Sequence, residues 1–295
     1  MKPPFLDKKS KTKSRPRSNS PRRRVHADTS SPPPSPGLIS LVIKFTSIIL
    51  VLILGTGTLL YIKRDQWGIS ALFQNHQAQQ TKPKPDPTKY AKLISELSAN
   101  RKLFKTLYMR AGTDTEKQRI ITQASALLEE SLPPMMRCWL GHPWAYEGTA
   151  TIPGEGKIAC GYFVSTIMRD AGFKINRIRV AQQASQNIIR TFVDNSKFYE
   201  VKTNTPYDKY VDDINKKYEG IHIVGLDMHV AFIVIKDGEM RFIHSGGLQK
   251  CVVDEGRDEA YSLENSNYRV ISNISRNRNA IKKWILSKPF NTGGQ

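Results

Sequence analysis

Residues 229–244 read HVAFIVIKDGEMRFIH, and this stretch decides the fold class that we expect. The apolar run at 229–236 predicts one strand, and residues 239–244 predict a second. Between them, Asp237 and Gly238 form a dipeptide that is typical of a two-residue hairpin turn. The stretch therefore predicts an antiparallel β-hairpin.

The hairpin determines which residues face one another across the turn. Counting back from it, Lys236 opposes Glu239, and His244 falls opposite Ala231. Side chains alternate between the two faces of a strand, so His229 shares a face with Ala231. We therefore expect the two histidines to be diagonal neighbours on one face, with the small Ala231 leaving room between them.

The remaining segments predict helices first and sheet afterwards. A helical hairpin is expected at 88–132, where Thr113 and Glu116 form a capping box and the Pro133-Pro134 pair ends the second helix. Two further helices are expected at 177–192 and 280–286. Further strands are expected at 220–226, 250–255 and 268–274. This order is typical of an α+β domain, which we place at 133–295.

A cysteine stands at the start of another expected helix. Residues 157–173 read KIACGYFVSTIMRDAGF, with apolar residues at helical spacing and Gly172 as the C-terminal stop. Cys160 falls in the first turn, where unpaired N–H groups and the helix dipole favour a thiolate. The alternative, a buried structural cysteine, stays open at this point.

Cys160, His229 and His244 together suit nucleophilic catalysis. A helix that carries Cys160 and packs on the histidine face of the sheet would complete a Cys–His–His cluster. Cys160 would be the nucleophile, His229 the base and His244 the group that orients the base. Each histidine alone has the simpler interpretation of a hydrogen-bonded core residue. One cysteine and two histidines are an unselective metal site, so no metal or cofactor is expected.

The N-terminal third predicts a membrane anchor. Residues 1–37 are rich in Ser and Pro and hold ten Lys or Arg against two Asp, which predicts a disordered basic tail. Residues 38–62 include 18 consecutive residues without a charge, enough to span a bilayer. Residues 63–87 are polar and Pro-rich, as in a linker. A cleaved signal peptide or a buried core helix are the alternatives for 38–62.

The charge distribution predicts orientation and partners. Because the basic tail precedes the span, the positive-inside rule places the N-terminus in the cytoplasm and the domain outside the inner, cytoplasmic membrane. Of the net charge of +19, +8 falls on residues 88–295, and this basic domain suits an anionic envelope polymer such as peptidoglycan. A nucleic-acid-binding arm at 1–37 is the less favoured interpretation.

Three cysteines are too few for a disulfide framework. A bridge between Cys138 and Cys251 stays open, and it would leave Cys160 free. No CxxC pair and no zinc-like spacing of Cys and His occurs in the sequence.

Three motifs in order resemble the NlpC-type cell-wall cysteine peptidases. They are LGHPWAYEG at 140–148, CGYFVSTIMRDAGF from residue 160, and HVAFIVIKDGEMRFIHSGG from residue 229. The resemblance implies a papain-like α+β fold with Cys160 as nucleophile, His229 as base and His244 as the orienting residue. It also implies cleavage of amide bonds in peptidoglycan stem peptides, although related members are amidases or acyltransferases on other substrates.

The sequence departs from that family around the substrate site. Ala159 and Gly161 replace the usual Asp and Ser beside the nucleophile, and Glu147 replaces a Gly. Trp144 stands where a substrate-contacting Tyr is common, and Tyr146 follows two residues later, so both are candidates for substrate binding. A non-catalytic wall-binding domain that keeps the fold is the alternative from another class of function.

Overall fold

The computed structural model describes residues 82–193, 199–201 and 205–293, which all belong to one compact unit, Gln79–Gln295. Its sheet has six strands in the order β1-β6-β2-β3-β4-β5, and every neighbouring pair is antiparallel. The strands are β1 Tyr199–Val201, β2 Gly220–Leu226, β3 Val230–Lys236, β4 Glu239–Gly246, β5 Cys251–Glu255 and β6 Arg269–Asn273. The predicted α+β class is confirmed.

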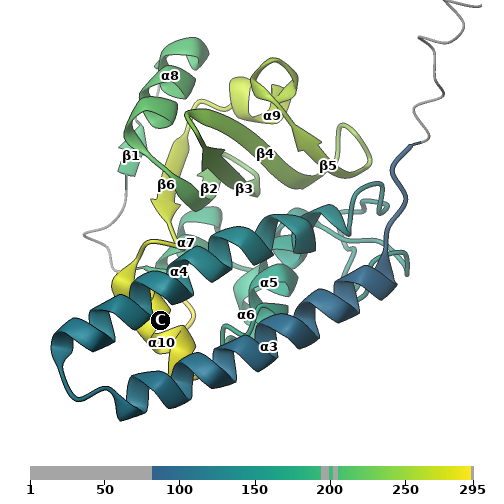
Figure 1. Ribbon diagram of the computed structural model, residues 1–295. Coiled ribbons are helices and arrows are strands. Elements are labelled where there is room, and N and C mark those ends of the chain that lie inside the picture. The colour runs from purple at the N-terminus through teal and green to yellow at the C-terminus, as the bar shows by residue number, and fades with distance from the viewer. Residues whose placement is uncertain (1–81, 194–198, 202–204, 294–295) are drawn as a thin grey trace, which may run out of the picture. The chain divides into compact units, whose positions relative to one another are not determined.

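Helices cover both faces of the sheet (Figure 1). They are α3 Pro87–Arg110, α4 Asp114–Arg137, α5 Cys160–Asp170, α6 Arg177–Ala181, α7 Ser185–Phe192, α8 Tyr207–Lys217, α9 Tyr261–Glu264 and α10 Arg278–Ile285. The larger apolar core joins one face of the sheet to α3, α4, α5, α7 and α10. A smaller core joins the other face to α8 and α9. The sequence did not predict α8, α9 or β1.

The β3–β4 hairpin has the predicted turn and register. Asp237 and Gly238 both adopt positive φ, at 54° and 77°, as a two-residue primed turn requires. Lys236 pairs with Glu239 and Phe232 with Ile243, which leaves His244 opposite Ala231. The twist of this turn matches that of the strands, and so the local sequence determines the register.

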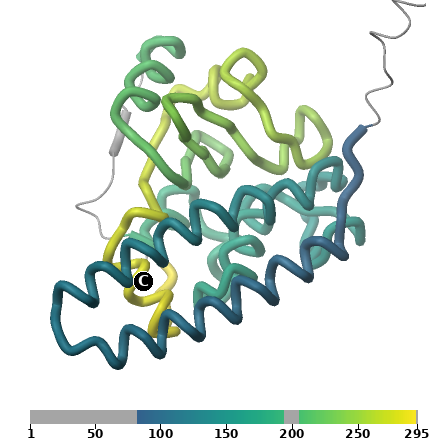
Figure 2. Tube along the Cα trace, in the orientation of Figure 1, coloured from purple at the N-terminus to yellow at the C-terminus, as the bar shows by residue number. Residues whose placement is uncertain are grey.

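Two long helices, α3 and α4, run side by side in opposite directions (Figure 2). The Asp86 side chain caps α3 by accepting the Lys89 N–H at 2.9 Å. Thr113 and Glu116 form the predicted capping box at the start of α4. These caps satisfy N–H groups that the first helical turn leaves unpaired.

The second of these helices is longer than predicted. Helix α4 continues through Pro133 and Pro134 to Arg137, so the expectation that the prolines end it was wrong. Proline has a helical φ, and its cost is the lost hydrogen bond. Burial of Leu132 and Met136 in the main core offsets that cost. The expected boundary at 132/133 therefore falls inside a helix.

The single helix expected at 177–192 is two short ones. The Asn176 side chain caps α6 by accepting the Arg179 N–H at 3.1 Å, and the chain leaves the helical path after Ala181. Ser185 then starts α7, and its hydroxyl donates to the carbonyl oxygen of Leu226 at 3.0 Å. The break lets α6 follow α5 while α7 packs on the end of β2.

The predicted tail, span and most of the linker lie outside the described residues. Within the ranges that the structure describes, no helix is both long and apolar enough to cross a bilayer. The prediction of a span at 38–62 stays a prediction.

Candidate active site

The nucleophile candidate is the first residue of α5. Cys160 follows the N-cap Ala159, and the first intrahelical hydrogen bond runs from the Phe163 N–H to the Ala159 carbonyl oxygen at 2.8 Å. The N–H groups of Cys160 and Gly161 therefore have no partner within the helix. Together with the helix dipole, they favour negative charge at this end of α5.

The segment before Cys160 is fastened to its surroundings. The Ser245 hydroxyl of β4 donates to the carbonyl oxygen of Ile158 at 2.7 Å. The Ala159 N–H donates to the carbonyl oxygen of Gly148 at 2.9 Å. These bonds hold Cys160 at the end of the sheet where β3 begins and β4 finishes.

Helix α6 packs closely on the first turn of α5. A Cβ atom at Gly161 would collide with the carbonyl oxygen of Ala181. Arg177, at the start of α6, donates to the Thr166 hydroxyl at 2.7 Å. Only glycine fits directly after the cysteine while α6 keeps this position.

Two histidines and a carboxylate form a continuous hydrogen-bonded chain. His229 Nε2 lies 2.9 Å from His244 Nδ1, so the predicted neighbourhood of the two rings is confirmed. His244 Nε2 lies 3.0 Å from Glu255 Oε2. Gln249 Nε2 donates to the other carboxylate oxygen at 2.6 Å. His244 and Glu255 are buried, so solvent does not compete for these bonds.

The donors and acceptors of this hydrogen-bonded chain run in one direction. An ionised Glu255 only accepts hydrogen bonds, so His244 carries its proton on Nε2 and presents an unprotonated Nδ1. His229 then donates to that nitrogen from its own Nε2, because one of the two facing nitrogens must carry the proton. This tautomer leaves Nδ1 of His229 as the basic nitrogen. The arrangement therefore defines which nitrogen of His229 can accept a proton.

The nucleophile helix does not pack on the histidine face of the sheet. The Phe163 ring of α5 contacts the Phe232 ring, with centroids 6.0 Å apart, in the main core. Ala231 and Phe242 belong to the smaller core on the opposite face. His244 contacts the Phe242 ring with centroids 4.3 Å apart. The expectation that α5 covers the His244 face was wrong, because Phe163 packs against the alternate residues of β3.

Cys160 nevertheless approaches the histidine chain at the start of β3. The backbone N–H of Val230, the residue after His229, lies close enough to the Cys160 sulfur to favour its thiolate form. Among the described residues, no hydrogen bond joins that thiol to the His229 ring. The structure thus brings the two histidines together and places the thiol beside the backbone that carries them. Catalytic contacts are often long in unliganded sites and tighten with substrate.

Burial keeps both reacting groups neutral. It raises the pKa of the Cys160 thiol, with partial offset from the N–H groups of Val230, Gly161 and Cys160 itself. Burial, and then the neighbouring His244, lower the pKa of His229 to about 3. The expectation that the helix end would favour a resting thiolate was wrong, because desolvation outweighs the backbone N–H groups. The resting pair is a thiol and a neutral imidazole.

The two expected substrate-contacting aromatics differ in exposure. The backbone N–H of Trp144 donates to the carbonyl oxygen of Lys250 at 2.9 Å, and the Trp144 ring lies against Gly247 in the β4–β5 turn. That turn begins three residues after His244, so Trp144 borders the site. Tyr146 is 82% exposed and its ring projects into solvent. Both positions are open to a ligand, and Tyr146 is the more accessible.

Among the described residues, the remaining cysteines and histidines take no part in the cluster. Cys138, Cys160 and Cys251 are all free thiols, so the open possibility of a bridge is not realised. His142 is buried and accepts the Gly154 N–H on Nδ1 at 2.9 Å. Within the part of the chain that the structure describes, no group of three or more His, Cys, Asp or Glu side chains is placed to hold a metal ion.

Sequence reasoning missed Glu255 and Gln249. The pairing of Gly246 with Cys251 puts Val253 opposite His244, and Glu255 is two residues further along the same face. Glu255 is thus a diagonal neighbour of His244, as His229 is on the other side. A four-residue turn between Gly246 and Cys251, if recognised in the sequence, would have given this register and placed Glu255 beside His244.

The fold and these side chains define a class of site: a cysteine at a helix N-terminus beside a buried imidazole–carboxylate chain, in an α+β domain. No family model, curated protein or solved structure matches the chain.

Proposed function

We propose that the chain is a membrane-anchored cysteine hydrolase that cleaves amide bonds, with peptidoglycan stem peptides as its substrate. The observation that carries the proposal is the hydrogen-bonded chain His229–His244–Glu255 at the same end of the sheet as Cys160. A single buried histidine needs no such orientation. A general base does, because its free nitrogen must carry a lone pair.

The proposed reaction begins when bound substrate brings Nδ1 of His229 to the thiol. The thiol proton passes to that nitrogen, and Sγ of Cys160 attacks the carbonyl carbon. The N–H groups of Cys160 and Gly161 donate to the developing oxyanion. The carbon–nitrogen bond then breaks, and the leaving amine takes the proton from His229.

Water completes the proposed cycle. It attacks the thioester on Cys160 and gives a proton to His229, and the thiol is restored when the carboxylic acid leaves. Each time His229 is protonated, His244 accepts its Nε2–H and Glu255 compensates the charge through His244.

The resemblance to NlpC-type peptidases supports the substrate class. It rests on the motifs around Trp144, Cys160 and His229 and on the implied papain-like arrangement. The departure at Gly161 has a local cause, because α6 leaves no space for the usual serine side chain. The net charge of +8 on residues 88–295 suits an anionic wall polymer.

One observation favours a second candidate, an amidase or acyltransferase on a non-wall substrate. Large apolar side chains are exposed near the site: Met228, next to His229, is 94% exposed, and Leu248 in the β4–β5 turn is 63% exposed. The β2–β3 and β4–β5 turns lie at the same end of the sheet. Exposed apolar side chains beside a nucleophile suit an apolar acyl group.

The test uses the full chain and its Cys160→Ala variant in detergent, each incubated with purified peptidoglycan. Mass spectrometry of the soluble products identifies released fragments. Fragments from the unmodified chain alone support the proposal, and their masses define the bond that is cleaved. If neither protein releases fragments but short acyl esters are turned over, the second candidate replaces it. No turnover of either substrate would indicate a non-catalytic wall-binding domain.

A further inference from the structure

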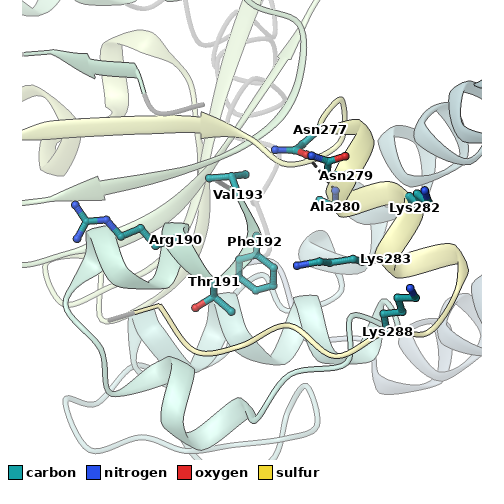
Figure 3. Close-up of a pocket in the computed structure, with 10 residues that line it drawn as sticks. All are labelled: Arg190, Thr191, Phe192, Val193, Asn277, Asn279, Ala280, Lys282, Lys283 and Lys288. Carbon is teal, nitrogen blue, oxygen red and sulfur yellow. Dashed lines mark hydrogen bonds between the residues drawn. The ribbon is translucent and has the colours of Figure 1, made fainter. Parts of the chain in front are cut away.

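A cavity of about 270 Å³ lies between the end of α7 and helix α10, away from the candidate active site. Thr191 and Phe192 form its floor, and Lys282, Lys283 and Lys288 stand on its α10 side (Figure 3). The floor residues are buried and the three lysines are exposed. The cavity is therefore a solvent-accessible hollow with a rigid base and a basic wall.

Among the described residues, the lining of this cavity carries positive charge and no negative charge. The sequence from residue 265 to residue 295 contains no Asp or Glu, and it includes all three lysines. Within the described ranges, no ion pair involves Lys282, Lys283 or Lys288. A concave surface with one sign of charge concentrates counter-ions.

The groups that shape the cavity are held in place. The Thr191 hydroxyl donates to the carbonyl oxygen of Asn187 at 3.0 Å and accepts the Gly293 N–H at 2.9 Å. The Lys283 ammonium lies 5.5 Å from the centre of the Phe290 ring. Figure 3 shows the Lys283 side chain extended across the floor toward Phe192. Held in this way, Lys283 loses less side-chain entropy when a ligand binds.

Donors outnumber acceptors in this cavity. Each lysine offers three N–H donors and no acceptor. Asn277 uses its side-chain oxygen to cap α10, accepting the Ala280 N–H at 3.1 Å, so its amide NH₂ remains as a further donor. A carboxylate has two oxygens, whereas a phosphate group presents three or four around one centre. A phosphate group satisfies more of these donors at once.

We propose that this cavity is a binding site for a phosphate group carried by a small polar ligand of the size of glycerol phosphate. Such a group occurs free, in phosphodiester polymers and in lipid headgroups. The inference does not depend on the proposed hydrolase activity, because the cavity shares no residue with the Cys160 site.

The first test measures protection of individual lysines in the full chain, held in zwitterionic detergent. The chain is acetylated with a limiting amine-reactive reagent, with and without glycerol 3-phosphate, and modification is quantified by peptide mass spectrometry. At about ten times Kd, bound ligand slows acetylation of Lys283 and Lys288 roughly ten-fold. Lys105, an exposed lysine of α3, is the internal control and keeps its rate. If glycerol 3-phosphate leaves the acetylation rates of Lys283 and Lys288 unchanged, as it does that of Lys105, the proposal is overturned. Equal protection by acetate would also overturn it.

The second test uses calorimetry on a double variant, Lys283→Ala with Lys288→Ala. We expect binding of glycerol 3-phosphate to weaken about ten-fold in this variant and to remain unchanged in Lys105→Ala. Undiminished affinity in the double variant would overturn the proposal. Inorganic phosphate and dihexanoyl phosphatidylglycerol below its micellar concentration then distinguish a free phosphate from a lipid headgroup. Dihexanoyl phosphatidylcholine, whose phosphate is neutralised by choline, is the matched lipid control.

Discussion

Two buried histidines on the same face of the sheet have opposite surroundings. His244 on β4 has a hydrogen-bond partner on each ring nitrogen, His229 on one side and Glu255 on the other. His222 on β2 is equally buried, yet among the described residues no side chain is hydrogen-bonded to either of its ring nitrogens, and only the backbone of Gly220 and Ile233 lies beside them. Burial lowers the pKa of His222 to about 4, and the backbone of Gly220 and Ile233 offsets this only in part.

The difference shows that burial alone does not make a histidine functional. His222 is a neutral core residue beside the Tyr218 ring, with centroids 5.4 Å apart. Glu255 sets the tautomer of His244, and His244 in turn sets the tautomer of His229. The simple interpretation of a core histidine applies to His222, whereas the chain of partners supports the proposed role of His244.

The largest effect is expected where the proposed reaction needs the atom itself. Cys160→Ala and His229→Ala should each lower release of peptidoglycan fragments by roughly 1,000-fold or more, because the nucleophile or its base is gone. Cys251→Ala, which removes another partly exposed free thiol, should keep the activity. Fragment release by Cys160→Ala at the normal rate would exclude it as the nucleophile.

A smaller loss of activity is expected when Glu255, which orients the two hydrogen-bonded histidines, is changed. Glu255→Gln should lower kcat roughly 100-fold and leave KM unchanged, because a neutral amide no longer fixes the tautomer of His244. The control is Glu239→Gln, at an exposed carboxylate of β4. Steady-state kinetics on a purified stem-peptide substrate separate the two constants. A rise in KM alone would assign Glu255 to substrate binding instead.

His222, which lies outside the hydrogen-bonded chain, should affect the stability of the fold and not the activity. Since the folded pKa of His222 is about 4 and the unfolded value is about 6.5, the unfolded chain binds the proton more readily. Stability should therefore fall as the pH falls from 6.5 to 4, by about 3 kcal/mol from this residue. His222→Leu should remove that part of the loss, as measured by urea unfolding at pH 7 and pH 4. An unchanged pH dependence would contradict the low pKa.

The smallest effect is expected at the rim of the site. Tyr146→Ala should raise KM about three-fold with kcat unchanged, because an exposed ring contributes only to binding. Tyr261→Ala removes a ring that is 56% exposed on α9 and serves as the control. Equal KM values for the two variants would remove Tyr146 from the proposed substrate site.

Local sequence rules predicted the parts of the fold that depend on neighbouring residues. The Asp237-Gly238 turn determines the β3–β4 register, and the capping box at Thr113 determines the start of α4. Both features need only residues a few positions apart. The same locality explains why the pairing of His229 with His244 was predictable.

Features that depend on tertiary packing were not predictable in the same way. Pro133 remains helical because its neighbours are buried in the core, and the break after Ala181 follows from the way α6 packs on α5. The face of the sheet that α5 covers depends on Phe163 meeting Phe232. Glu255 could be assigned to the site only from the β4–β5 register.

The direction of the hydrogen-bonded chain is the central claim, and nitrogen NMR of the imidazole rings tests it most directly. In the full chain labelled with ¹⁵N-histidine, His244 and His229 should both carry their proton on Nε2, with Nδ1 unprotonated. Assignment by His244→Asn and His229→Asn identifies the two rings. A proton on Nδ1 of His229 would contradict the account, because that nitrogen could not then accept the proton of Cys160.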